Sequence, residues 1–191
     1  MPDAERLNLG DDRYWTYAVR RFDRTAGPEG APHARRMYAS AMTLTGRHDG
    51  QQGGSYLHVV QALEDSGGAG LADDLRQLFR RAVFNLFVGN RDDHLRNHGF
   101  LLSRSGWRLA PAFDINPNPA KDHHALTWDG ASDASSLEPV LGTAGLYRLD
   151  GKEAQAIVAE VRDVVAGWQE LARELDLPRV EIATMTRGFL I

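Results

Sequence analysis

A predicted helix with one apolar face is followed in the sequence by a polar segment and then by a predicted hairpin. Apolar residues recur every three or four positions over Leu75–Phe87, which is the pattern of a helix with one buried face. Residues 90–97 follow and are rich in Asn, Asp and Arg. Two apolar-rich runs, Phe100–Leu102 and Trp107–Ala110, then flank the turn-prone segment Ser103–Gly106. We expect a buried helix that leads to a polar loop, and a hairpin that returns the chain towards that loop.

Other segments predict a mainly α-helical fold with a few short strands, the α+β class. Helical spacing is found at Tyr56–Leu63 and again along one apolar face over Ala154–Ala172. Pro178 suits the first turn of a terminal helix. The apolar positions of that helix are Ile182, Met185 and Phe189. Trp15–Val19 and Ala125–Trp128 have the composition of short strands.

Length and composition favour a single globular domain over residues 1–191. The chain has 42% hydrophobic and 25% charged residues, which is ordinary for a globular protein. It has no run of 18 apolar residues and no basic segment followed by an apolar stretch at its start, so we expect no membrane contact and a cytoplasmic location. A formal net charge of −4 makes direct nucleic-acid binding unlikely in our interpretation.

Asp92, Asn97 and Asp114 have the residue types and spacing of a kinase active site. In the protein-kinase catalytic loop an Asp accepts the hydroxyl proton, and an Asn five residues later holds Mg²⁺. A further Asp beyond a hairpin holds a second metal ion. Here Asp92 and Asn97 are five residues apart, and Asp114 follows the expected hairpin. Phosphoryl transfer with ATP and Mg²⁺ is therefore the leading prediction, with Asp92 as general base and Asn97 and Asp114 as metal ligands.

The motif around these residues resembles the catalytic core of the HipA family of bacterial toxin kinases. The resemblance lies in Asp-x-His-x-x-Asn at residues 92–97 and Leu-x-Pro-x-Phe-Asp at residues 109–114. Further segments resemble the same family over nearly the whole chain. They are Val19–Arg24, Ser40–Leu44, Ser55–Leu57, Asn116–Pro119 and Ala154–Trp168. The expected fold is thus a protein-kinase-like C-lobe of the HipA type, with a hinge-like segment at residues 1–24 and the catalytic region at residues 90–114.

The resemblance also implies roles for individual residues and for partners. The Arg20, Arg21 and Phe22 backbone would form the adenine hinge, and Phe113 would lie beside the nucleotide. His94, Leu95 and Arg96 belong to the same nucleotide-binding set, together with Asn97 and Asp114. As a toxin of this family, the protein would phosphorylate a protein hydroxyl, typically on an aminoacyl-tRNA synthetase, and would have an antitoxin-like partner.

The chain departs from the family pattern at its amino-terminal end. Family members carry a β-rich lobe before the hinge, with a phosphate-covering loop and a nucleotide-binding lysine. Here the lysines are Lys121 and Lys152, and neither precedes Arg21. The glycine-rich segment Gly50–Gly54 lacks a following lysine and is interpreted as a loop before a helix. We therefore expect the N-terminal lobe to be a separate polypeptide, or absent from this product. Arg96 stands where many relatives have lysine.

Two other interpretations remain open on the sequence alone. In the first, the chain is a catalytically dead remnant or a partner-binding module, because half of the nucleotide cleft is missing. In the second, clustered His and Asp residues form the metal centre of a hydrolase. The residues concerned are His94, His98, His123, His124, Asp92, Asp93, Asp114 and Asp122. Asp93 is interpreted as a solvated neighbour of Asp92, and His123 and His124 as loop or strand-edge residues.

Overall fold

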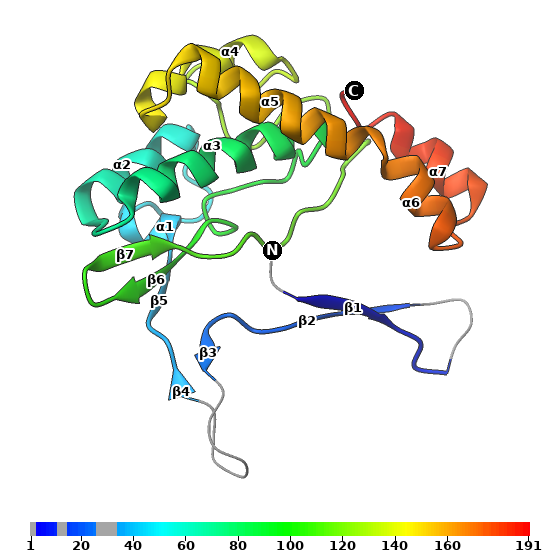
Figure 1. Cartoon of the computed structure of the whole chain (residues 1–191), viewed down its shortest axis with the longest axis horizontal. Coiled ribbons are helices and arrows are strands. Elements are labelled where there is room, and N and C mark those ends of the chain that lie inside the picture. Colours follow the sequence, from blue (N-terminus) through cyan, green and yellow to red (C-terminus); the bar gives the residue numbers. More distant parts are fainter. Residues whose placement is uncertain (1–2, 11–14, 26–33) are drawn as a thin grey trace.

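The structure is a computed structural model that describes residues 3–10, 15–25 and 34–191. It combines helices with small antiparallel sheets (Figure 1). The helices are α1 (Ala41–Leu44), α2 (Tyr56–Ser66), α3 (Leu71–Phe87), α4 (Leu137–Gly142), the 3₁₀ turn η1 (Ala144–Tyr147), α5 (Gly151–Ala166), α6 (Trp168–Glu174) and α7 (Arg179–Thr186). The strands are β1 (Ala4–Leu7), β2 (Thr16–Val19), β3 (Arg24–Thr25), β4 (Ala34–Arg35), β5 (Tyr38–Ser40), β6 (Gly99–Ser103) and β7 (Gly106–Leu109). The hinge-like segment therefore includes residues 1–2 and 11–14, which lie outside the described part of the chain.

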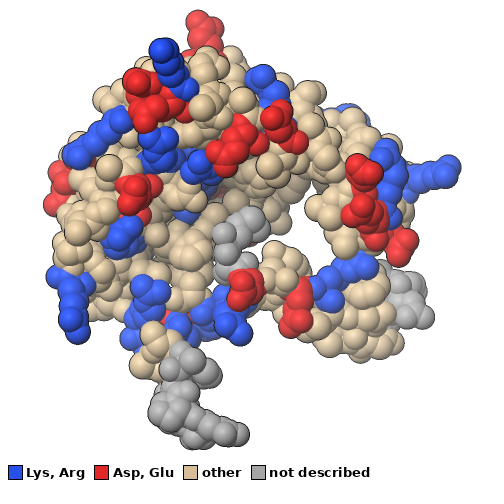
Figure 2. All heavy atoms as spheres, in the orientation of Figure 1, with Lys and Arg blue, Asp and Glu red and all other residues tan. Residues whose placement is uncertain are grey.

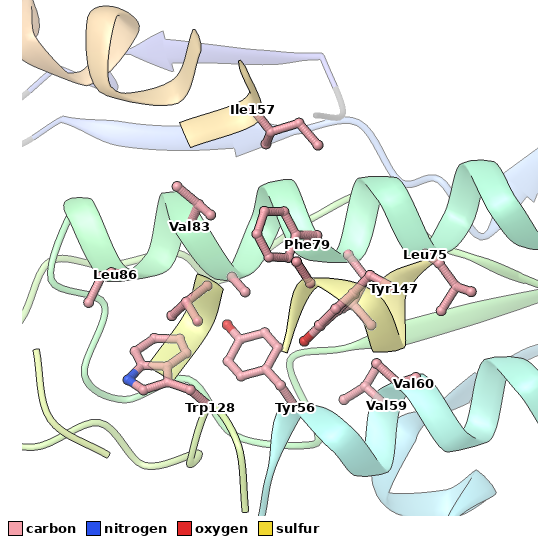
Figure 3. Packing of buried hydrophobic residues seen from close by; sticks show 14 of the residues in the cluster. Tyr56, Val59, Val60, Leu75, Phe79, Val83, Leu86, Trp128, Tyr147 and Ile157 are labelled. Carbon is pink, nitrogen blue, oxygen red and sulfur yellow. The ribbon is translucent and has the colours of Figure 1, made fainter. Parts of the chain in front are cut away.

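Helix α3 is the centre of the core, between α2 and α5 (Figure 1). The apolar positions of the predicted stripe are almost fully buried, at 0–2% exposure, and they are Leu75, Leu78, Phe79, Ala82, Leu86 and Phe87. Figure 3 shows Phe79 facing Tyr147, whose ring centroid lies 5.3 Å away in an edge-on arrangement. Tyr56 of α2 stacks on Trp128 at 5.2 Å. Aromatic burial of this kind contributes strongly to stability, so α3 has a fixed position from which the following loop departs.

Local capping explains where the helices that flank α3 begin. The Ser55 hydroxyl accepts a hydrogen bond from the Leu57 amide, and the His58 ring accepts one from the Ser55 amide at 3.1 Å. Asp150 and Glu153 form the same reciprocal box at the start of α5. Each box satisfies amides that a helix leaves without internal partners. The predicted helix at Tyr56–Leu63 is confirmed and extends to Ser66.

The expected hairpin is confirmed as β6 and β7, and it forms a three-stranded antiparallel sheet with β5. Phe100 pairs with Leu109, and Ser103 pairs with Gly106 at the turn. Just beyond the hairpin, the Ala110 amide donates to the Gly99 carbonyl at 2.8 Å. The hairpin therefore places Ala110, which lies shortly before Asp114 in the chain, beside Gly99, which directly follows His98.

β1 and β2 lie at one side of the helical body (Figure 1), and the Arg6 guanidinium of β1 donates to the Leu175 carbonyl at the end of α6. β1 and β2 form a two-stranded hairpin in which Trp15, Tyr17 and Val19 are exposed. Figure 2 shows open space between this hairpin and the helical body, whose visible face carries intermixed acidic and basic side chains. The Arg6 guanidinium lies 3.9 Å from the centroid of the Trp15 ring. A two-stranded hairpin is marginally stable in water, and its exposed apolar side chains form a surface that a partner could cover.

Two predicted elements differ from the structure. The apolar face over Ala154–Ala172 is divided between α5 and α6, because the chain changes direction at Gly167. The expected strand Ala125–Trp128 is a loop with one isolated bridge, between Ser55 and Thr127. Backbone hydrogen bonds from Thr127 to Gly54 and from Tyr56 to Thr127 satisfy the same groups that a strand would use.

The C-terminal end also differs in detail from its prediction. Pro178 precedes α7, and Phe189 lies beyond the helix that it was expected to join. Phe189 stacks on Trp168 with centroids 4.1 Å apart, and the Leu190 amide donates to the Phe87 carbonyl at 2.8 Å. The end of the chain is therefore attached to the end of α3. Within the described residues, no helix is long and apolar enough to cross a bilayer.

Candidate active site

The loop after α3 turns sharply at Gly89, which has a φ of +64°. A Cβ atom at this position would lie 2.0 Å from the Gly188 carbonyl oxygen, so only glycine fits. The Asn90 amide then donates to the Asn85 carbonyl, and the Asn97 amide donates to the His94 carbonyl at 2.8 Å. The loop at residues 90–97 is thus compact and directly continuous with the buried end of α3.

Asp93 is the buried anchor of this loop, so its interpretation as a solvated residue was wrong. Asp93 is only 3% exposed, and its side chain accepts hydrogen bonds from three residues. The donors are the Tyr56 hydroxyl of α2, the Asn85 amide of α3 at 2.9 Å, and His98 Nε2 at 3.0 Å. Burial by itself would raise the pKa of the Asp93 carboxyl. The electrostatic interaction with His98, together with hydrogen bonds from His98 and Tyr56, outweighs burial and holds the pKa of Asp93 below its usual value.

Arg81 of α3 adds a buried positive charge behind the same network. Its Nη2 donates to the Ala110 carbonyl at 2.7 Å, and its charge interacts with that of Asp93. Burial lowers the pKa of the Arg81 guanidinium, and the nearby Asp93 opposes that shift. Arg81 therefore connects the loop to the chain just beyond the β6–β7 hairpin.

Asp92 has the opposite environment to its neighbour. Its side chain is 59% exposed and forms an ion pair with Lys121. The hydrogen bond from Lys121 holds the pKa of the Asp92 carboxyl below its usual value. The sequence left some doubt about which of the two adjacent carboxylates acts. Exposure favours Asp92 as the carboxylate that could meet a substrate, because Asp93 is buried and its side chain already accepts several hydrogen bonds.

The two expected metal ligands present oxygen atoms of the right kind. Asn97 is only 7% exposed, yet its side-chain amide makes no hydrogen bond to any residue that the structure describes. Asp114 has a φ of +54°, a left-handed conformation that is unusual outside glycine. Its carboxylate is exposed and accepts a hydrogen bond from the Asn116 amide at 2.9 Å. Amide and carboxylate oxygens with free capacity fit the ligand preferences of Mg²⁺.

The structure brings the hinge-like residues and Phe113 together. Phe22 lies with its ring centroid 5.7 Å from that of Phe113 and 6.2 Å from that of Tyr38. These rings, with Arg20 and Arg21, line a hollow of about 340 Å³. Aromatic walls of this kind suit a flat heterocycle. Tyr38 is a wall residue that sequence reasoning missed.

His94, Leu95 and Arg96 line a different hollow from the aromatic one. This second hollow, of about 140 Å³, lies against the Gly50–Gly54 loop. Arg96 pairs with Asp49 there, and its Nη2 lies 3.3 Å from His94 Nε2. The structure therefore separates these three residues from Arg20, Arg21, Phe22 and Phe113.

The histidines are engaged individually rather than gathered around one point. His98 binds Asp93, while His123 Nδ1 lies 3.1 Å from an Asp133 carboxylate oxygen. His124 lies 3.2 Å from the Asn90 carbonyl, and burial lowers its pKa to about 4. Among the described residues, no group of three or more His, Cys, Asp or Glu side chains is placed to hold a metal ion. This geometry does not favour the hydrolase interpretation.

Sequence reasoning missed the supporting residues of the loop. Asn85 and Arg81 are polar residues close to the apolar stripe of α3. Their position beside that stripe was the one sequence signal that they could be buried and support the loop. Tyr56 begins a predicted helix and gave no such signal. Lys121 is 29 residues beyond Asp92, so only the folded chain shows their contact.

Comparison with known proteins identifies the family of this chain. The model of the HipA-like C-terminal domain matches residues 1–168. The chain belongs to this family. The resemblance stated from the sequence is therefore confirmed. A search of curated proteins found no match.

A solved structure shows the same fold as this HipA-like domain. It is HipA of Shewanella oneidensis MR-1, from a toxin–antitoxin complex with HipB and operator DNA. The TM-score is 0.77 at 18% sequence identity. The match covers 98% of this chain and 49% of that HipA chain. The HipA-like domain thus spans about half the length of the protein that it matches.

Proposed function

We propose that this HipA-like domain is the larger lobe of a serine/threonine-protein kinase that transfers the γ-phosphate of ATP to a protein hydroxyl. The observation that carries the proposal is the outward-facing Asp92 on a loop anchored by the buried Asp93. The loop also ends in Asn97, whose amide has free capacity. A general base must meet an incoming hydroxyl. The Asp92 carboxylate suits this role, because it is exposed to solvent while the buried Asp93 fixes the loop that carries it.

In this proposal Asp92 accepts the proton of the acceptor hydroxyl. The hydroxyl oxygen forms a bond to the γ-phosphorus as the bond to the bridging oxygen breaks, and ADP leaves. The hollow lined by Phe22, Tyr38 and Phe113 holds the adenine. Asn97 and Asp114 would hold Mg²⁺, which neutralises phosphate charge when it is bound.

The proposed setting is a bacterial toxin–antitoxin system in the cytoplasm, where ATP is available. The matched HipA is described in complex with HipB and its operator DNA. By this likeness we propose an antitoxin-like protein partner, and an N-terminal lobe that completes the nucleotide cleft. The family resemblance further supports an aminoacyl-tRNA synthetase as the class of substrate.

A partner-binding module without catalysis is the second candidate. The exposed Tyr17 and Val19 of β2, and Trp15 just before it, favour this candidate, because apolar side chains on a marginal hairpin gain stability when a partner covers them. The two candidates differ in one measurable property, since only the kinase needs a working nucleotide site.

The test is the thermal midpoint of the full chain with and without millimolar Mg²⁺ and ATP. Ligand at about 100 times its Kd adds about 2.7 kcal/mol to the free energy of unfolding. For a domain of this size that corresponds to a rise in Tm of roughly 5–10 °C. We expect the rise in the wild-type chain and its loss in Asp114→Ala.

The matched control is Asp176→Ala. Asp176 is exposed and has a φ of +56°, against +54° for Asp114, so both substitutions impose similar backbone strain. The control should keep the full nucleotide-dependent rise. A wild-type chain whose midpoint does not respond to nucleotide would instead support the partner-binding module.

A further inference from the structure

Lys121 is held beside the catalytic loop by the backbone that carries it. The Asn118 amide donates to the Gly89 carbonyl at 2.9 Å, and Arg91 Nη1 donates to the Asn118 carbonyl at 3.0 Å. The Ala120 amide then donates to the Asn118 side chain at 3.1 Å, which closes a turn. Lys121 follows this turn directly. Its position next to Asp92 therefore depends on these backbone contacts as well as on its own flexible side chain.

The ammonium group of Lys121 contacts the Asp92 carboxylate, and the neighbouring cations are engaged elsewhere. Arg91 is buried and bonded to Asn118 and Ser135. Arg96 is paired with Asp49 and lies against His94. The Lys121 side chain is 47% exposed. An exposed ion pair of this kind adds little to stability, so the side chain is free to exchange its partner.

The place where Lys121 reaches Asp92 is also where a γ-phosphate must lie. A general base acts within about 3 Å of the hydroxyl that it deprotonates. The attacking oxygen and the phosphorus approach to roughly 3–3.5 Å before reaction. The γ-phosphate oxygens therefore come within several ångströms of the Asp92 carboxylate. A lysine side chain that touches Asp92 reaches them through a rotation of its stem.

We propose that Lys121 is a catalytic residue that binds the γ-phosphate of ATP and exchanges the Asp92 carboxylate for it when the nucleotide arrives. This inference rests on the proposed kinase function. The terminal phosphate carries more negative charge than one carboxylate, so it competes effectively for the ammonium group. The exchange has two effects. Lys121 stabilises charge on the transferring group, and Asp92 is released to accept the hydroxyl proton.

The test compares the affinities of the full-length chain for ATP and ADP by calorimetry in the presence of Mg²⁺. ADP lacks the γ-phosphate, so a contact to that group affects ATP alone. We expect Lys121→Met to weaken ATP binding by roughly tenfold or more, the value of a charge-assisted hydrogen bond. ADP binding should change by less than about twofold. Lys121→Arg keeps the charge and should recover part of the ATP affinity.

The chain offers a matched control, because its other lysine is Lys152, an exposed residue at the start of α5. Lys152→Met removes the same charge and should change neither affinity. If Lys121→Met weakens both nucleotides equally, or neither, the γ-phosphate role is overturned while the kinase proposal stands. If the wild-type chain binds neither nucleotide, the proposal of a working nucleotide site within this lobe fails, and the role of Lys121 fails with it.

Discussion

At the scale of single residues, Asp92 and Asp93 are adjacent in sequence and opposite in environment. Asp93 is sealed among Tyr56, Asn85 and His98, while Asp92 is exposed to solvent. Successive side chains in this loop point in different directions, so one carboxylate anchors the loop and the other is presented. The two residues should therefore respond very differently to the same substitution.

We expect Asp93→Ala to lower the free energy of unfolding by about 2–4 kcal/mol, because it leaves buried donors without an acceptor. Asp92→Ala should change it by less than about 0.5 kcal/mol, as is usual for an exposed residue. Urea denaturation measures both values. In a kinase assay Asp92→Ala should abolish phosphoryl transfer and leave nucleotide binding largely intact. Transfer at the wild-type rate would exclude Asp92 as the base, and equal stabilities of the two variants would exclude the anchoring role of Asp93.

At the scale of elements, the junction between α3 and the loop depends on Gly89. The left-handed backbone and the close Gly188 carbonyl act together there, whereas Gly46 has nearly the same φ, +65°, and no atom within 4 Å of an added Cβ. The two glycines therefore separate the effect of backbone strain from the effect of steric exclusion.

We expect Gly46→Ala to destabilise the chain by about 1 kcal/mol, the usual value for a left-handed residue that gains a side chain. Gly89→Ala should cost about 3 kcal/mol or more, because the C-terminal segment must also move. Chemical denaturation of the two variants gives the comparison. Equal losses would mean that the contact between Gly89 and Gly188 relaxes without strain.

Much of the secondary structure could be predicted from the sequence. Period and turn composition located α2, α3 and the β6–β7 hairpin, because each buries one face against a single core. The break at Gly167 and the loop at Ala125–Trp128 were missed. At Ala125–Trp128 the distant residues Gly54–Tyr56 take up the backbone groups that a strand would use. At the break, Trp168 follows Gly167 and stacks on the distant Phe189.

At the scale of the whole molecule, the HipA-like domain has a helical body that carries the loop at residues 90–97, and an N-terminal hairpin with exposed apolar residues. The aromatic hollow lies between these two parts of the chain, since Phe22 and Tyr38 come from the N-terminal region and Phe113 follows β7. The chain spans about half the length of the HipA chain whose fold it shares.

The stability of the whole domain should depend on pH through His124. Burial lowers its pKa to about 4, whereas an unfolded chain restores a value near 6.5. The unfolded state thus binds more protons between these values, so stability is full above about pH 6.5 and is lost as the pH falls towards 4. The loss should approach about 3 kcal/mol.

Denaturation midpoints between pH 4 and pH 7 test this expectation. His124→Gln should flatten the dependence on pH, while the adjacent, exposed His123→Gln should leave it unchanged. A His124→Gln variant with the wild-type slope would show that another group controls acid stability.

The sequence by itself determined the order of helices and hairpin, the family resemblance and the spacing of Asp92, Asn97 and Asp114. These features are local, because helical period, turn composition and motif spacing act over a few residues. Only the tertiary structure decided that Asp93 is buried, that Lys121 meets Asp92, and that Phe22 faces Phe113. Each of these contacts joins segments distant in the chain, and packing around α3 fixes which distant segments meet.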